Sequence, residues 1–289
     1  MKIAFIGCGE VGLAYINAFK HTSHQITYLC ARNHPASLQQ LARELNASLE
    51  TKPGDWLGEA DVVVSAVFGH GALDMFTQAQ PWLRPGALYI DMTTADPEHM
   101  VQAAQLAARH DIHFTDVAVM GAVGLLKHKT TLICAGTGAA QTVELFETIQ
   151  TPISIKGNRA GDAATLKLLR SVFTKGLEAL AVECLVAAEK KDLRPTLYEV
   201  LSDIDATPLS TFLETLVITH TTHAPRRLKE VTEAKRQLTL NNIEPLVSTG
   251  VESLFARTSQ ALEHSLPGEE KTIESSLTWL AGVAEVRKP

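Results

Sequence analysis

The sequence contains few cysteines and no long apolar run. Its 289 residues include four cysteines and no C-x-x-C pair, so we expect neither a disulfide framework nor a cysteine-based metal site. This cysteine usage is typical of a reducing compartment and predicts a cytoplasmic protein. No stretch reaches the roughly 18 uninterrupted apolar residues of a membrane span, and the apolar run near the N-terminus is too short for a signal peptide. We therefore expect no membrane association and no bound metal.

The chain also lacks an excess of positive charge. Its 26 Lys and Arg residues are outnumbered by 32 Asp and Glu, which gives a net charge of -6, and neither half is basic. This balance argues against a nucleic-acid partner and favours a small-molecule substrate. With 45% hydrophobic residues the chain can bury a sizeable core, and its length favours two domains.

Short β-type runs alternate with helical patterns over the first 155 residues. The runs predict strands at residues 3–6, 26–30, 62–67, 87–91, 113–117 and 131–135. Several of them are apolar almost without interruption, which is typical of strands covered by helices on both faces. The pattern predicts an α/β fold with a doubly wound (Rossmann) parallel sheet.

The strand signal stops at residues 156–157, and helical patterns take over. We expect helices at residues 161–191, 209–221, 225–240 and 244–264, with prolines at their starts and breaks. The predicted organisation is a nucleotide-binding domain, residues 1–156, followed by an all-α domain, residues 157–289, for substrate binding and dimerisation. A first helix of about 30 residues needs neighbours for its apolar side, so we expect a homodimer through the helical domain.

A glycine-rich turn directly follows the first predicted strand. Gly7, Gly9 and Gly12 match G-x-G-x-x-G, with Glu10 and Val11 opening the next helix. Missing side chains at such a turn let the backbone approach a pyrophosphate that helix N-terminal amides bind. The motif is weak alone, where it can be merely a tight turn, but its place inside a βαβ unit predicts a dinucleotide site.

The end of the second strand predicts which dinucleotide binds. An acidic residue about 20 positions after the motif would bind the ribose 2′-hydroxyl of NAD, whereas an arginine accepts the 2′-phosphate of NADP. No Asp or Glu lies between Glu10 and Glu44, and Arg32 stands at the discriminating position. We therefore predict NADP, the alternative being that Arg32 is an ordinary surface cation.

Three further strand ends carry small, polar or glycine-rich segments. They contain Phe68, Thr93 and the run Met120, Gly121, Ala122. Ligands of doubly wound sheets bind beyond the carboxyl ends of the strands, so we expect Phe68 and Thr93 to contact the cofactor and residues 120–122 the substrate. His70 is a candidate general base, although a single histidine in such a loop is more often structural.

The long helix carries a polar stripe on an otherwise apolar surface. Lys167 and Ser171 are one turn apart, and Lys175 follows one turn later. A solvated face is the simpler interpretation. However, the helix leaves the nucleotide domain directly, so its first turns are expected to face the cofactor. A lysine partly withdrawn from water there has a lowered pKa and can exchange a proton with a substrate hydroxyl.

Together these motifs resemble the β-hydroxyacid dehydrogenases, which include 6-phosphogluconate and 3-hydroxyisobutyrate dehydrogenases. The resemblance rests on the glycine-rich turn, on a D-x-S/T-T-x-x-P segment (Asp91, Thr93, Thr94, Pro97), on the loop near Gly121 and on G-x-x-x-x-x-K from Gly161 to Lys167. The helical half resembles phosphogluconate-dehydrogenase-like proteins. The resemblance implies hydride transfer with NADP, with Lys167 as the general acid/base and Ser171 orienting the substrate oxygen.

This chain departs from the family pattern in its substrate contacts. The family usually has Asn where Ser171 stands and Ser-Gly-Gly where this chain has Met120, Gly121 and Ala122. A thioether in place of a hydroxyl removes a hydrogen-bond donor for a carboxylate. On a later helix, Arg226 stands where the family commonly has a Lys-Asp pair, and we expect it to contact substrate. These changes favour a different acid or a more apolar substrate.

Three functions remain open from the sequence. The first is an NADP-dependent oxidoreductase acting on a hydroxy acid or related carbonyl compound, with decarboxylation following when the product is a β-keto acid. The second is an imine-type reductase, in which the general acid need not be lysine. The third is a non-catalytic NADP-binding sensor, which has no need for Lys167 in the cleft.

Overall fold

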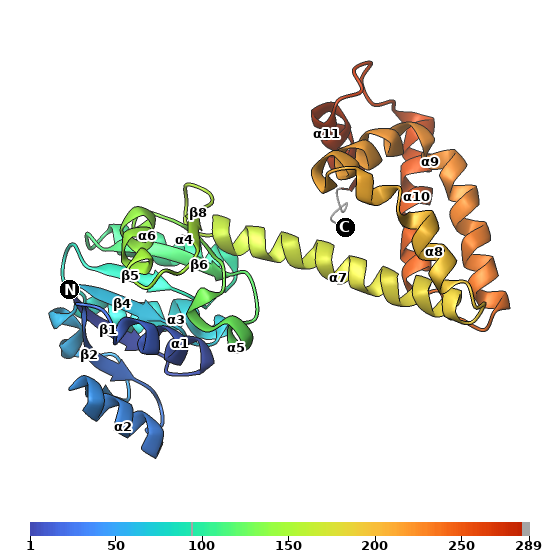
Figure 1. The fold of residues 1–289 in the computed structure, drawn as a ribbon. Coiled ribbons are helices and arrows are strands. Elements are labelled where there is room, and N and C mark those ends of the chain that lie inside the picture. The colour runs from blue at the N-terminus through green and yellow to red at the C-terminus, as the bar shows by residue number, and fades with distance from the viewer. Residues whose placement is uncertain (94, 285–289) are drawn as a thin grey trace. The chain divides into compact units, whose positions relative to one another are not determined.

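The computed structural model describes residues 1–93 and 95–284 and divides the chain into two compact units (Figure 1). The units are Met1–Val172 and Phe173–Pro289. Their division falls inside the long helix α7, Asp162–Glu189. The domain boundary at residues 156–157 that composition predicts stays a prediction.

The first unit is built on one eight-stranded sheet in the order β3-β2-β1-β4-β5-β6-β7-β8. The strands are β1 (Lys2–Ile6), β2 (Gln25–Cys30), β3 (Ser48–Glu50), β4 (Val62–Ser65), β5 (Leu88–Asp91), β6 (His113–Val119), β7 (Leu132–Ala135) and β8 (Ile153–Ile155). All six predicted strands are present, and the doubly wound α/β fold is confirmed. The sequence interpretation missed β3 and β8, which are three residues each.

One pair of strands differs from the expected parallel arrangement. β6 and β7 are antiparallel, whereas every other neighbouring pair is parallel. The connection between them, residues 120–131, contains a single helical turn, α5 (Val123–Leu126), and the 3₁₀ turn Lys127–Lys129. A parallel crossover needs a connection that passes over the sheet, usually a longer helix. The chain therefore turns back at the end of β6, and β7 runs in the opposite direction.

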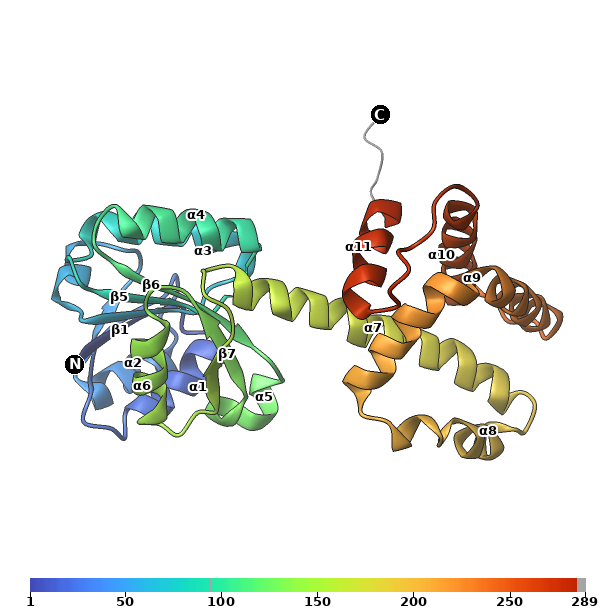
Figure 2. The ribbon, with the colours of Figure 1, turned by 90° about the horizontal axis from the view of Figure 1, so that it is seen from above.

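Helices cover both faces of the sheet (Figure 2). On one face lie α1 (Glu10–Phe19), α2 (Ala36–Leu45) and α6 (Ala139–Glu147), and on the other lie α3 (Ala72–Ala79) and α4 (Pro97–Ala108). Successive side chains of a strand point to opposite faces. Ile3 and Phe5 accordingly join one apolar cluster, while Ala4 and Ile6 join the other.

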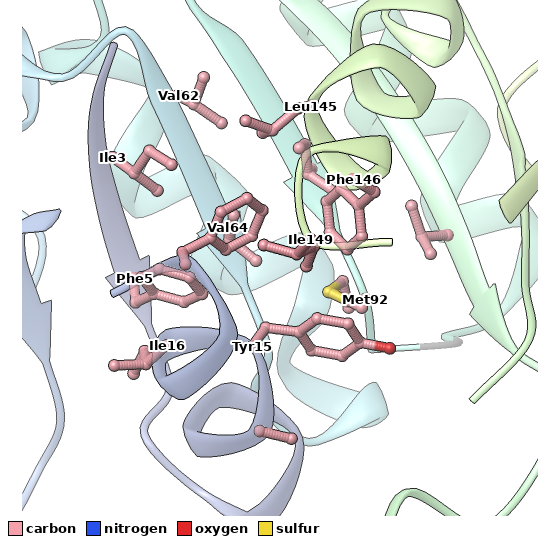
Figure 3. Close-up of a cluster of buried hydrophobic side chains, with 14 of the residues drawn as sticks. Ile3, Phe5, Tyr15, Ile16, Val62, Val64, Met92, Leu145, Phe146 and Ile149 are labelled. Atoms are coloured by element: carbon pink, nitrogen blue, oxygen red, sulfur yellow. The ribbon is translucent and has the colours of Figure 1, made fainter. Parts of the chain in front are cut away.

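The larger cluster shows how α1 and α6 are held on the sheet (Figure 3). Tyr15 and Phe19 of α1 pack against Phe146 of α6, with ring centroids 5.4 and 5.6 Å apart. All three side chains are fully buried. Burial of each aromatic ring contributes about 1.5–3 kcal/mol of transfer free energy, so these contacts fix the place of α1.

The second unit is helical. It contains the later part of α7, then α8 (Arg194–Leu201), α9 (Leu209–Leu240), α10 (Leu246–His264) and α11 (Ile273–Ala284). The prediction of two helices separated near residue 223 is wrong, because α9 continues through Pro225. Pro225 lacks the N–H that would bond to Thr221, yet Thr221 and Ala224 are buried, and α9 packs along α10. None of the helices in residues 1–93 and 95–284 is long and apolar enough to cross a membrane.

Buried polar side chains form a row across three neighbouring strands, at the carboxyl ends of β4 and β5 and in the middle of β6. Ser65 of β4 is the register partner of Asp91 of β5, which is in turn the partner of Asp116 of β6. All three are fully buried. Burial and, to a smaller extent, the nearby Asp116 raise the pKa of Asp91 to about 6, against the hydrogen bonds that it accepts from Thr93.

The raised pKa of Asp91 predicts a pH-dependent stability. Because the folded protein binds this proton more tightly than the unfolded chain, whose carboxyl has a pKa of about 3.8, the free energy of unfolding falls as the pH rises from about 4 to about 6. Two pKa units correspond to at most roughly 3 kcal/mol. Asp91→Asn removes this contribution. Urea denaturation at pH 4 and pH 7 is expected to show that the free energy of unfolding of the variant, relative to that of the unmodified protein, is higher at pH 7 than at pH 4.

Asp111→Asn, at an exposed position, is the control. If the difference in free energy of unfolding between Asp91→Asn and the unmodified protein were the same at both pH values, the assignment of the raised pKa to Asp91 would be contradicted.

Candidate active site

The glycine-rich turn is shaped to bring backbone close to a ligand. Gly7 has a φ of +94°, and a Cβ atom there would lie 2.4 Å from the Ala66 carbonyl oxygen. A Cβ on Gly12 would lie 2.0 Å from the Gly7 oxygen. Both positions therefore require glycine for packing between β1, β4 and α1.

Gly9 has a different role in this turn. A Cβ there would meet nothing within 4 Å, so the backbone faces open space. Gly9 is also the N-cap of α1 and offers no side chain to the first amides of the helix. An uncapped helix N-terminus beside an open glycine is a favourable place for a pyrophosphate. The turn thus fits a dinucleotide by its own geometry.

A cavity of about 480 Å³ lies next to this turn, at the carboxyl edge of the sheet. It is lined by Glu10, Val11, Ala66, Val67, Met92, Thr93, Val119, Gly121, Ala122, Val123, Gly124 and Lys167. Six of the predicted site residues are therefore brought together: Glu10, Val11, Thr93, Gly121, Ala122 and Lys167. A larger cavity, about 740 Å³, runs along the other side of α1 and shares only Glu10 with them.

Lys167 is the basic residue of this cavity wall. It lies less than two turns into α7 and is half-buried. Burial lowers the pKa of its amine below the usual value for lysine, because the charged form loses hydration. The amine is thus adjusted in the direction that proton exchange near neutral pH requires.

The start of α7 is held against the sheet by a residue that the sequence interpretation missed. Oδ2 of the buried Asp116 accepts hydrogen bonds from the amides of Gly161 and Ala164, each 3.0 Å long. Gly161 has a φ of +96°, and a Cβ on it would lie 2.8 Å from the Pro97 oxygen. The signal in the sequence was an acidic residue inside a predicted strand.

Thr93 faces the cavity from the end of β5. Its amide and hydroxyl donate to Oδ1 of Asp91, at 2.9 and 2.5 Å. The predicted Thr94 lies outside the described residues, as does the side chain of His70. Phe68 follows β4, and its side chain is 82% exposed.

The predicted Met120 and Ser171 do not line this cavity. Met120 packs against a small apolar cluster that includes Ala163, and Ser171 is exposed on α7. Arg226 belongs to the second unit, where it forms an ion pair with Glu230. Within the described part of the chain, no group of three or more His, Cys, Asp or Glu side chains could hold a metal ion.

Arg32 follows the end of β2 and is exposed. The missed strand β3 ends at Glu50, which is the register partner of Cys30 at the end of β2. The Glu50 carbonyl accepts the amide of Ala31 at 2.9 Å and contacts Nε2 of His34 at 3.0 Å, so it holds the segment on both sides of Arg32.

Known proteins resemble this chain over most of its length. An uncharacterized 28.5 kDa protein from Methanothermus fervidus is 27% identical and aligns with 88% of this chain and 98% of its own. A solved conserved protein of unknown function, described as structurally similar to 3-hydroxyacid dehydrogenases, is 26% identical with a TM-score of 0.64, over 90% of this chain and 98% of its own.

The fold is also that of an imine reductase from Myxococcus stipitatus, solved as a variant in complex with NAD+. That structure has a TM-score of 0.75 at 17% identity and covers 96% of this chain and 99% of its own. The family model of the NAD binding domain of 6-phosphogluconate dehydrogenase matches residues 2–155, more than half of the chain. The chain therefore belongs to the family of the NAD binding domain of 6-phosphogluconate dehydrogenase.

Proposed function

We propose that this protein is an NADP-dependent oxidoreductase that transfers a hydride between the nicotinamide and a small hydroxy acid or related carbonyl compound. One observation carries the proposal: Lys167, which bears the amine, lines the same cavity as the glycine turn. The turn contributes Glu10 and Val11 to this cavity, and the segment after β5 contributes Thr93. A proton-exchanging group and a nucleotide cradle thus share one space.

The chain's residues divide the work between binding and proton transfer. The cofactor, when bound, accepts or donates the hydride. The turn at Gly7, Gly9 and Gly12, with the amides that open α1, would hold its pyrophosphate. In oxidation the neutral Lys167 amine accepts the hydroxyl proton as the C–H hydride leaves; in reduction the ammonium returns a proton to the carbonyl oxygen.

Imine reduction is the second candidate, and the lining of the cavity favours it. Seven of the twelve lining residues are apolar: Val11, Ala66, Val67, Met92, Val119, Ala122 and Val123. An apolar wall suits a cyclic imine better than a small acid. A panel of hydroxy acids and cyclic imines, followed by NADPH absorbance, separates the two, and no turnover of any compound would leave the sensor function.

Lys167→Ala tests the proton-transfer role. We expect NADP binding to stay nearly intact and kcat on the best panel compound to fall at least about a hundredfold, the usual scale for loss of a general acid/base. Lys175→Ala is the matched control, since Lys175 lies two turns along the same helix and pairs with Glu178 at 2.7 Å. Equal turnover by Lys167→Ala and the unmodified protein would remove the lysine mechanism.

Arg32 is proposed to select NADP. A charge-assisted bond to the 2′-phosphate contributes roughly 1.5–3 kcal/mol, so Arg32→Ala is expected to weaken NADP+ binding about ten- to a hundredfold and to leave NAD+ binding unchanged. Calorimetric titration measures both, with Arg43→Ala on the surface of α2 as control. Equal or tighter binding of NAD+ by the unmodified protein would overturn the preference.

A homodimer is proposed because the chain leaves apolar side chains of α7 exposed. Leu169 is 60% exposed, Val172 74% and Val182 61%. Apolar side chains repeated along one long helix are typical of a surface that a second copy covers. Light scattering is expected to give twice the chain mass of 31.3 kDa. A mass of 31.3 kDa at micromolar concentration would contradict the dimer.

A further inference from the structure

The N-terminus of α7 is held by a side chain from a distant strand. The first amides of any helix have no partner within the helix and need an acceptor. At the start of α7, the amide of Gly161, the residue before the helix, and the amide of Ala164 donate to the same oxygen of Asp116, which lies 45 residues before Gly161 and is fully buried. A carboxylate at this end also interacts favourably with the helix dipole.

A second carboxylate at the same helix end acts on other amides. Asp162, the first residue of α7, accepts the amides of Asn158 and Arg159 at 2.9 and 3.0 Å. These contacts order the preceding loop at the surface. Asp116 alone, of these two carboxylates, ties the helix itself to β6.

The tie acts on Lys167 through a short, rigid path. Lys167 follows Ala164 by three residues, about 4.5 Å along the axis at 1.5 Å per residue. Fixing the Ala164 amide therefore fixes both the rotation and the axial position of the turn from which the Lys167 side chain extends. β6 itself ends at Val119, which lines the cavity with Lys167.

The neighbouring strand has a parallel arrangement. Asp91 is the register partner of Asp116 and holds the amide and hydroxyl of Thr93, on another part of the cavity wall. Two adjacent buried carboxyls thus each fix one polar residue of the cavity. The positions of Thr93 and Lys167 therefore both depend on the paired strands β5 and β6.

We propose that Asp116 is a positioning residue for Lys167: by binding the amides of Gly161 and Ala164 it sets where the Lys167 amine stands in the cavity. The inference rests on the proposed function for the use of that amine, and on the hydrogen bonds alone for its placement. Asp116 touches neither substrate nor cofactor in this role.

The placement is tested without any substrate. Amide hydrogen exchange at Gly161 and Ala164, and the NMR signal of ¹³C-dimethylated Lys167 assigned with Lys167→Arg, are measured with and without NADP+. Asp116→Ala is expected to speed exchange at both amides at least tenfold and to move the Lys167 signal toward that of solvent-exposed lysines. Asp116→Asn keeps an acceptor oxygen at the same reach, so it should retain most of the protection.

Asp162→Asn is the matched control, because it makes the same charge change at the same helix end without touching the Gly161 or Ala164 amide. Its Lys167 signal is expected to stay unchanged. If Asp116→Ala does not fold, Asp116→Ser replaces it, since a hydroxyl one atom shorter stays polar but does not reach both amides. Unchanged exchange and an unchanged Lys167 signal in Asp116→Ala or Asp116→Ser would overturn the proposal.

Activity supplies the second readout, on the panel compound that the unmodified protein turns over fastest. Misplacing a reacting group by about 1 Å can cost up to about a hundredfold, so Asp116→Ala is expected to lower kcat tenfold or more while the Kd for NADP+ changes less than twofold. Asp116→Asn should restore kcat to within about threefold. If Lys167→Ala keeps full turnover, the proposed function fails, but the exchange and NMR results still decide the placement.

Discussion

Parallel pairing of β1 with both β2 and β4 is the constraint on which the candidate site depends. It brings the carboxyl ends of these strands to the same edge of the sheet, so the loops that follow the strands also lie at this edge. Parallel pairing continues from β4 to β5 and β6, so the glycine turn, Thr93 and the loop at Gly121 lie at one edge, although more than 100 residues separate the first from the last.

The cavity follows from what surrounds that edge. Gly7 and Gly12 let α1 approach β4 more closely than any side chain would allow, while Gly9 leaves the start of α1 open. The antiparallel return of β7 places α5 at the same edge, where Val123 and Gly124 close the wall. Burial in this wall removes hydration from the amine of Lys167 and lowers its pKa. The lowered pKa is thus a consequence of the packing.

The alternation of apolar runs with helical patterns along the sequence predicted most of this fold. Strands such as β4, which begins with three valines and is buried on both faces, give a strong local signal. β3 and β8 were missed because three residues carry too little pattern. Pro225 predicted a break in α9, but tertiary packing against α10 outweighs the loss of one hydrogen bond.

The candidate site was predictable where its chemistry is local. The glycine turn and Lys167 lie in short motifs, and both line or adjoin the cavity. Asp116 was missed because its importance lies in contacts with residues distant in the chain. The place of Met120 was not predictable either, since spacing alone does not fix which way a loop side chain points; it packs against Ala118, Ile133, Ala135 and Ala163, and its predicted contact with the substrate stays a prediction.

Hydride transfer itself is the central claim, and isotope transfer tests it most directly. The protein is incubated with the hydroxy acid's carbonyl form or a cyclic imine and with NADPH carrying deuterium at one face of C4, and the product is analysed by mass spectrometry. The account predicts a product one mass unit heavier, with deuterium on the former carbonyl or imine carbon, from one of the two C4-labelled forms only. A protein that binds NADPH but transfers deuterium from neither form to any compound of the panel would contradict it.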